Sequence, residues 1–404
     1  MNSSLAAALR SPVGFVAERH DTFIAIRRDL HAHPELGLEE HRTAALVAER
    51  LHQWGIEVHT GIGGTGVVGV IRGARDTSGR SVGLRADMDA LPMQEENDFA
   101  HRSTRPGLMH GCGHDGHTTM LLAAAQYLAA TRRFDGSVFL IFQPGEEGFA
   151  GAKKMIDDGL FERFPANEVY ALHNWPGLPA GHIGLNPGPM MAAADRVEIV
   201  ISGRGGHAAH PHLTVDPVLI AGHIITAAQS IVARNVAPID TAVVSLCSLS
   251  AGHPGAFSVV PREARLVGTI RTFQHSVQTL IEQRLAELVQ STARAFGGEA
   301  SVKYERIYPA TINHAPQYEH AARVAEELVG RERVVRHMPP SMGAEDFAFM
   351  LHVKPGCYVR LGQGGAEGGC WLHNSRYDFN DAVIPLGAGY LAALVERRMP
   401  LTTE

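Results

Sequence analysis

The chain has 404 residues, of which 45% are hydrophobic and 19% are charged, and its formal net charge at pH 7 is −6. This composition excludes an intrinsically disordered chain, and the mildly acidic charge offers no general basic field for a nucleic acid or an anionic membrane. At about 150 residues per domain, the length predicts two or three domains.

Targeting and redox signals are sparse. No apolar run reaches the roughly 18 residues that a membrane-spanning helix needs, and the first residues lack the basic segment and apolar core of a signal peptide. Four cysteines (Cys112, Cys247, Cys357 and Cys370) are too few and too scattered for a disulfide framework. We therefore expect a cytoplasmic protein with reduced thiols.

The first part of the chain alternates helices with short apolar strands. Apolar spacing predicts helices over residues 15–30, 39–54, 118–131 and 150–158. Strands are predicted over 67–71, 81–86, 138–142 and 169–172. The strand 138–142 (VFLIF) is apolar throughout, as expected of a strand buried on both faces. This order indicates an α/β fold with a mostly parallel sheet flanked by helices.

A different pattern begins near residue 189. Residues 196–201 (RVEIVI) alternate strictly, and helices and strands are then expected at 216–234, 241–249, 263–271, 276–296 and 299–304. Two strands with a helix, repeated, resemble a ferredoxin-like α+β unit. The α/β pattern returns with a helix at 317–329, a strand at 357–361 and a helix at 384–398. We therefore predict a larger domain, made of residues 1–188 and 306–404, into which a smaller domain of residues 189–305 is inserted.

A glycine-rich segment at residues 61–66 (GIGGTG) matches the dinucleotide-binding pattern G-x-G-x-x-G, with Asp87 about 20 residues further on. That fingerprint requires a helix to begin at the glycines, so that its N-terminus meets the pyrophosphate. Here residues 67–71 (VVGVI) are predicted as a strand instead. We therefore interpret the segment as a turn between two strands.

The segment 109–117 (MHGCGHDGH) packs three imidazoles, a thiol and a carboxylate into nine residues. It is predicted as a loop before the helix at 118. Cys112 and His114, one residue apart, can both face one metal ion, and these ligand types serve zinc, manganese, cobalt and nickel. Two alternatives stay open: histidines that cap the next helix, or a Cys112 nucleophile activated by His114 or His117 and oriented by Asp115.

Four more residues of ligand or acid–base type follow apolar segments. Glu146 and Glu147 lie in the segment QPGEEG directly after the VFLIF strand, where open α/β sheets place their active sites, and adjacent side chains point in different directions. One is expected to bind metal and the other to face water, unless both are solvated surface acids. His173 follows the strand VYAL, and His373 lies in a similar His-Asn pattern near the C-terminus.

Eight segments together resemble one known family: RADMDALPM, MHGCGHDGHT, FQPGEEG, ALHNWP, GRGGHAAHPH, VVPREARLVGTIRTF, MGAEDFAFML and LHNSRYDFND. They are similar, in order and over residues 31–383, to the aminoacylase and carboxypeptidase metallohydrolases (metallopeptidase family M20). They fit best the amidohydrolase branch, which includes hippurate hydrolases, N-acyl-amino-acid deacylases and auxin-conjugate hydrolases. The resemblance implies hydrolysis of N-acyl or N-aroyl amino acids to a carboxylic acid and an amino acid.

The resemblance also implies a centre of two divalent metal ions, most often Mn²⁺, with Zn²⁺, Co²⁺ or Ni²⁺ as substitutes. Its implied ligands are Cys112 (as a thiolate, not a nucleophile), His114, Glu147, His173 and His373. Glu146 would be the general base, although the sequence alone does not decide which glutamate plays which part. Asp87 would orient a ligand through a hydrogen bond.

The inserted domain would be a lid and dimerisation domain, giving a homodimer or homotetramer. His207 would stabilise the oxyanion, from the same chain or from a partner. Arg271 would hold the substrate carboxylate with its two-pronged guanidinium, unless it forms a structural salt bridge. Ser258 stands where relatives often carry an asparagine that contacts the substrate, so we expect a weaker contact there.

Two rival functions remain at this point. A dipeptidase or small-peptide carboxypeptidase would need an acidic partner for the substrate's free amino group, and the sequence identifies none. A non-catalytic metal-dependent binding protein is the other, but the intact Glu146 argues against it.

Overall fold

The computed structural model describes residues 11–365 and 370–401. The chain forms two compact units. The larger unit contains Met1–Met190, Ile312–Pro339 and Asp346–Glu404, and the smaller unit contains Met191–Thr311 and Pro340–Glu345. The last strand of the smaller unit, β13 (Glu299–Tyr308), continues past residue 305, where the sequence placed the boundary.

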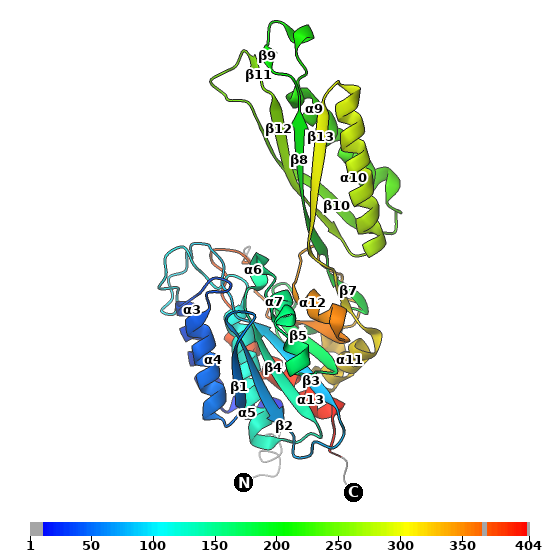
Figure 1. Ribbon diagram of the computed structural model, residues 1–404. Helices are drawn as coiled ribbons and strands as arrows, with labels where there is room; N and C mark the ends of the chain where they lie inside the picture. The colour runs from blue at the N-terminus through cyan, green and yellow to red at the C-terminus, as the bar shows by residue number, and fades with distance from the viewer. Residues whose placement is uncertain (1–10, 366–369, 402–404) are drawn as a thin grey trace. The chain divides into compact units, whose positions relative to one another are not determined.

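The larger unit is built on an eight-stranded sheet in the order β1-β2-β4-β3-β5-β16-β6-β15 (Figure 1). The strands are β1 (Glu57–Ile62), β2 (Gly66–Arg72), β3 (Ser81–Asp87), β4 (Ser137–Gln143), β5 (Glu168–Trp175), β6 (Ile183–Gly184), β15 (Val334–Val335) and β16 (Gly356–Gly362). The neighbours β4, β3, β5 and β16 run parallel, while β1, β2 and β6 add antiparallel pairs. The predicted α/β fold with a mostly parallel sheet is confirmed.

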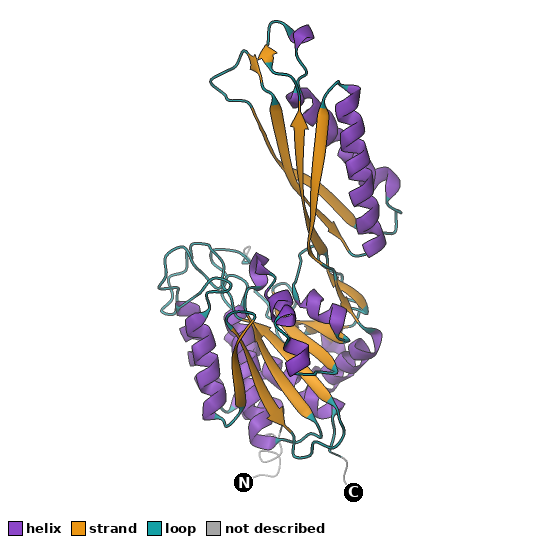
Figure 2. Ribbon diagram, in the orientation of Figure 1, coloured by secondary structure: helices purple, strands orange, loops and turns teal. Residues whose placement is uncertain are grey.

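Helices flank this sheet (Figure 2). They are α2 (Pro12–Ala17), α3 (His20–Ala32), α4 (His41–Gln53), α5 (His114–Thr131), α6 (Glu146–Phe149), α7 (Gly151–Asp157), α8 (Leu160–Arg163), α11 (Ala315–Val329), α12 (Phe347–Val353) and α13 (Ile384–Arg398). Helix α5 is buried on nearly all sides, which explains its apolar, alanine-rich sequence. The strand β4 is buried along almost its whole length, as the VFLIF run predicts.

The start of α5 differs from the prediction. The helix begins at His114, not at residue 118, so His114, Asp115 and His117 lie in its first turn. Gly113 adopts a left-handed conformation, with φ of 92°, and its carbonyl accepts the N–H of His117 at 3.0 Å. Because glycine reaches this conformation without a steric penalty, the loop turns directly into the helix.

The glycine segment at residues 61–66 is a turn, as predicted. It joins β1 and β2, which pair antiparallel, and Gly63 and Gly64 have φ values of 65° and 111°. The dinucleotide-binding interpretation is excluded because a strand, not a helix, follows the glycines.

The smaller unit contains a four-stranded antiparallel sheet in the order β10-β12-β8-β13. Its strands β8 (Ala193–Ser202), β10 (Ala242–Ala251), β12 (Glu263–Thr272) and β13 pack against α9 (Pro217–Asn235) and α10 (His275–Ala295) (Figure 1). The chain order βαββαβ confirms the ferredoxin-like prediction. Two short pairs complete the list: β9 (Gly206–His207) with β11 (Val259–Val260), and β7 (Gly188–Met191) with β14 (Thr311–Asn313).

Helix α9 is, in the described part of the chain, the one helix long and apolar enough to cross a membrane by length and composition. Its Ile220, Ile224 and Ile231 are buried in the core of the smaller unit, together with residues of β8 and β12. One face of α9 therefore packs in this core, while Val218 and Leu219 on the same helix are exposed.

Candidate metal centre

The five residues predicted to bind metal converge in the larger unit. Ligand atoms of Cys112, His114 and His173 lie within 4.8 Å of one another, and so do those of Cys112, Glu147 and His373. A further group joins His114 to both Glu146 and Glu147. The shared members make this one continuous cluster.

The parallel sheet explains this convergence. The strands β3 and β4 end side by side, with Asp87 paired to Gln143, and Glu146 follows within three residues. The neighbouring β5 carries His173 near the same edge. The carboxyl ends of parallel strands form the crevice in which open α/β sheets bind ligands. His173 lies within β5, which runs on to Trp175, and not in a loop after the strand as predicted.

The surroundings of His173 favour a neutral imidazole. Its Nδ1 donates to the carbonyl of Asn174 at 2.7 Å, so Nε2 carries the lone pair and accepts from the Cys112 thiol at 3.5 Å. Burial, followed by the nearby His117, lowers the pKa of His173 well below its ordinary value. A neutral imidazole is the form that binds metal.

The charges in the cluster favour a cation. Burial, and then Glu147 and Glu146, raise the pKa of the Cys112 thiol well above its ordinary value. A thiol and two carboxylates placed this close need a nearby positive charge if all are to ionise, and a divalent metal ion supplies it. His114 Nε2 is also buried without a hydrogen-bond partner among the described residues. The donor set therefore fits a bound metal.

Aspartates at the end of β3 support the cluster. Asp89 accepts from His114 Nδ1 at 3.1 Å and from the Glu147 N–H at 2.9 Å. Asp89 was not among the predicted residues, although it is the second aspartate of RADMDALPM. Asp87, predicted to orient a ligand, accepts a hydrogen bond from His117 Nδ1 at 2.6 Å and lies 3.7 Å from Nε2 of the predicted ligand His114.

The two adjacent glutamates point to different partners. Glu147 has non-helical backbone angles (φ −75°, ψ 71°) and Gly148 has φ of 90°. The backbone therefore turns sharply after Glu146, and the two side chains lie in different surroundings. Glu147 Oε1 lies 3.1 Å from His373 Nε2. Glu146 accepts the N–H of Asp346 at 3.2 Å and is only 7% exposed. The two carboxylates therefore have different surroundings, Glu147 beside His373 and Glu146 beside the backbone of Asp346.

A buried arginine anchors the loop that carries His373. Arg27 of α3 is fully buried, and it donates to Asp381 at 2.7 Å and to Asp378 at 2.6 Å. Its Nη1 also lies 3.5 Å from Asp115, the neighbour of His114 in α5. Arg27 thus connects the helix that begins at His114 with the loop that follows His373.

Of the three predicted residues of the smaller unit, His207 and Ser258 lie together and Arg271 lies apart. His207 in β9 pairs with Val259 of β11, and the Ala208 N–H donates to the Ser258 carbonyl at 2.8 Å. Arg271 is the last but one residue of β12, which begins at Glu263, shortly after β11. At about 3.3 Å per residue, the strand separates Arg271 from its His207 end by about 26 Å.

Arg271 borders a hollow of about 340 Å³ on the sheet of the smaller unit. Burial lowers the pKa of its guanidinium. Within the residues that the structure covers, the Arg271 guanidinium forms no hydrogen bond or close ion pair, so the structural salt bridge left open by the sequence is not found there.

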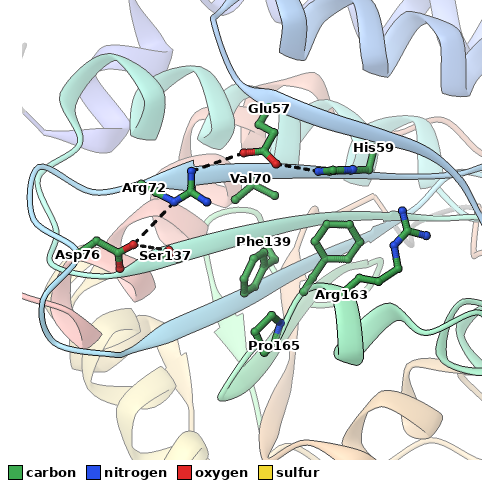
Figure 3. A pocket seen from close by; sticks show the side chains of 10 residues that line it. Glu57, His59, Val70, Arg72, Asp76, Ser137, Phe139, Arg163 and Pro165 are labelled. Atoms are coloured by element: carbon green, nitrogen blue, oxygen red, sulfur yellow. Dashed lines mark hydrogen bonds and ion pairs between the residues drawn. The ribbon is translucent and has the colours of Figure 1, made fainter.

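A separate hollow of about 350 Å³ lies on the edge of the larger sheet (Figure 3). Four of its charged or titratable side chains pair with one another: Glu57 lies 2.9 Å from His59 and 3.6 Å from Arg72, and Arg72 lies 3.8 Å from Asp76. None of its residues belongs to the predicted site.

Comparisons with known proteins agree with this geometry. The family model described as peptidase family M20/M25/M40 matches residues 83–397. A hippurate hydrolase of Campylobacter jejuni is 42% identical over 372 residues, covering 92% of this chain and 95% of that protein. An N-acetylcysteine deacetylase of Bacillus subtilis is 37% identical over 377 residues, covering 93% and 96%.

A solved structure shares the fold as well. It is a Bacillus subtilis protein described as a dinuclear metal-binding peptidase of the M20 family, with a TM-score of 0.82, 33% identity, and coverage of 94% of this chain and 98% of that chain. The family model spans residues 83–397, which include every predicted metal ligand, and these relatives each cover more than 90% of the chain. The chain therefore belongs to peptidase family M20/M25/M40, as its motifs predicted.

Proposed function

We propose that this protein is a metal-dependent amidohydrolase that cleaves the amide bond of N-acyl or N-aroyl amino acids to a carboxylic acid and a free amino acid. The observation that carries the proposal is the cluster of thiol, imidazoles and carboxylate at the end of the parallel sheet, with a second, nearly buried glutamate beside it. The hippurate hydrolase and deacetylase relatives support this class of substrate.

The cofactor in this proposal is a pair of divalent ions. Cys112, His114, Glu147, His173 and His373 would hold them, and Mn²⁺ is the first candidate, with Zn²⁺, Co²⁺ and Ni²⁺ as alternatives. When bound, such ions polarise an amide carbonyl and lower the pKa of water towards 7.

Glu146 is the proton carrier in this proposal. It takes a proton from the attacking water and delivers it to the nitrogen of the leaving amine. A C–O bond forms at the acyl carbon while the C–N bond breaks, which accounts for both products. The Asp346 N–H, 3.2 Å from one Glu146 oxygen, fixes the orientation of the carboxylate.

His207 is the oxyanion donor in this proposal. Its Nδ1 accepts the Ala209 N–H at 3.1 Å, so the ring proton resides on Nε2, which is free to donate. Ser258 lies beside it, and Arg271 would bind the substrate carboxylate. Because Arg271 lies about 26 Å along the sheet from the His207 end, one small substrate contacts both only if they come from different copies. We therefore assign the smaller unit as lid and dimerisation domain, with His207 acting in the partner's site.

The oligomer, a homodimer or homotetramer, and a cytoplasmic location are part of the same proposal. All four cysteines are free, which is consistent with a reducing compartment.

A substrate panel tests the function. Purified protein is incubated with N-benzoylglycine, N-acetyl amino acids and glycyl dipeptides, with added Mn²⁺ and again after chelation, and amino acid release is measured. Metal-dependent release from the N-acyl substrates is expected. Release from dipeptides alone would favour the peptidase alternative, and binding without release in metal-loaded protein would favour a binding role.

A further inference from the structure

Two tryptophans border the candidate metal centre. Trp175 lies two residues after His173 in β5, so both side chains share one face of the strand, and their ring centroids are 6.4 Å apart. Trp371 lies two residues before His373. The two indoles meet edge to face, with centroids 5.7 Å apart and an interplanar angle of 85°. An aromatic pair is thus connected to two different metal ligands, one through a strand and one through a loop.

The two rings differ in what covers them. The guanidinium of Arg360, in the neighbouring β16, lies 3.7 Å from the centroid of the Trp175 ring. Arg360 is buried, and it donates to the carbonyls of Pro339 at 3.0 Å and Met190 at 2.9 Å. Trp175 is therefore a fixed support, with one face occupied. Trp371 is 42% exposed, and its indole remains accessible beside the metal ligands.

The chemistry of this pair suits the uncharged end of the substrate. The substrate's amino acid half carries a carboxylate, which needs a cation or several donors. The cation beside the pair is Arg360, whose guanidinium is covered by Trp175 and bonded to backbone carbonyls. Aromatic rings pair well in edge-to-face or offset geometry, and they bury far more area than an acetyl group.

We propose that Trp371, supported by Trp175, forms the acyl subsite and selects substrates with an aromatic acyl group. This inference rests on the proposed function, because it names the substrate class of the same site. Trp371 is a specificity-determining residue in this proposal. Its ring packs against the substrate's aryl group, so that the amide to be cleaved lies beside the metal ligands.

Kinetics of Trp371 variants test the subsite. For Trp371→Ala, kcat/KM for N-benzoylglycine should fall about 10- to 100-fold, mainly through KM, while kcat/KM for N-acetylglycine should change less than about threefold. Trp371→Phe, which keeps an aromatic ring, should restore most of the loss. Trp54→Phe is the matched control, because Trp54 packs against the core at the end of α4. Equal losses for both substrates, or no loss for either, would overturn the proposal.

A binding measurement separates this inference from the proposed function. Calorimetric titration of Mn²⁺-loaded protein with benzoate, and with acetate for comparison, needs no turnover. Benzoate should bind more tightly than acetate, and Trp371→Ala should weaken benzoate binding about tenfold or more. If the parent protein releases no amino acid yet shows this Trp371-dependent binding, the hydrolase proposal fails while the aromatic subsite stands. If the parent protein hydrolyses both N-acyl substrates but Trp371→Ala leaves benzoate binding unchanged, the aromatic subsite is refuted while the hydrolase proposal stands.

Discussion

Replacing Arg27 with methionine removes the buried cation that connects α3, the start of α5 and the loop after His373. Three carboxylates, those of Asp115, Asp378 and Asp381, lie within 3.5 Å of the Arg27 guanidinium. The exposed fraction of its side chain is 0%. Methionine fills much of the same volume, so the main effect is the loss of charge and of hydrogen bonds.

The neighbouring Arg28 sets the scale for this effect. Removing one partner of a buried ion pair costs about 3–5 kcal/mol, because the remaining charge is left uncompensated. Arg28 also pairs with Asp381, at 2.9 Å, but its side chain is 48% exposed. Such exposed pairs contribute about 0–1 kcal/mol. We therefore expect Arg27→Met to lower the unfolding free energy by at least about 2 kcal/mol more than Arg28→Met.

Urea unfolding of the metal-free proteins, followed by circular dichroism, measures this difference without a contribution from metal binding. Metal titration of the folded variants adds a second readout. Arg27→Met should bind metal more weakly, because the loop that carries His373 loses its anchor, whereas Arg28→Met should bind like the parent. If the two variants have unfolding free energies within about 1 kcal/mol of each other, the anchoring role of Arg27 is wrong.

Three further predictions concern the site itself. Glu146→Gln should lower kcat at least about 100-fold while metal content stays unchanged, and an active variant would refute the proton-transfer role. Gly113→Ala should destabilise the fold by about 2–5 kcal/mol and weaken metal binding, because φ is 92° and the new Cβ would lie 2.5 Å from Asn174 Oδ1. Gly107→Ala, also with positive φ (78°) but with no atom within 4 Å, is its control, and equal effects would show that the contact is unimportant. Coexpressed Glu146→Gln and His207→Ala chains should recover about a quarter of parental activity if His207 acts in the partner's site, and no recovery would place it in its own.

Much of the larger architecture follows from sequence periodicity. The long helices and the strands of both units leave apolar patterns of their own period, so their positions were predictable within a few residues. The strands β6 and β15 have two residues each, too few to leave any pattern. The early start of α5 also escaped prediction, because it depends on the left-handed backbone of Gly113, which the sequence does not distinguish from an ordinary loop glycine.

The five residues that the family resemblance implies as ligands come from well-separated segments of the sequence, and the structure brings their side chains together. The supporting contacts were not predictable from the sequence. Asp87 and Asp89 are two residues apart in the sequence, yet Asp87 hydrogen-bonds His117 and Asp89 hydrogen-bonds His114. That division depends on where α5 begins, which in turn depends on Gly113. The asymmetry of Glu146 and Glu147 arises from backbone angles that adjacent, identical residues cannot reveal in a sequence.

The central claim is that the cluster around Cys112 holds two divalent ions on which amide hydrolysis depends. Metal-free protein is titrated with Mn²⁺, bound metal is counted, and benzoate or glycine release from N-benzoylglycine is measured at each step. We predict no turnover without metal and a rise that ends at two equivalents, with Cys112→Ala binding fewer ions. Full turnover by the metal-free protein, or saturation of both binding and turnover at one equivalent, would contradict the account.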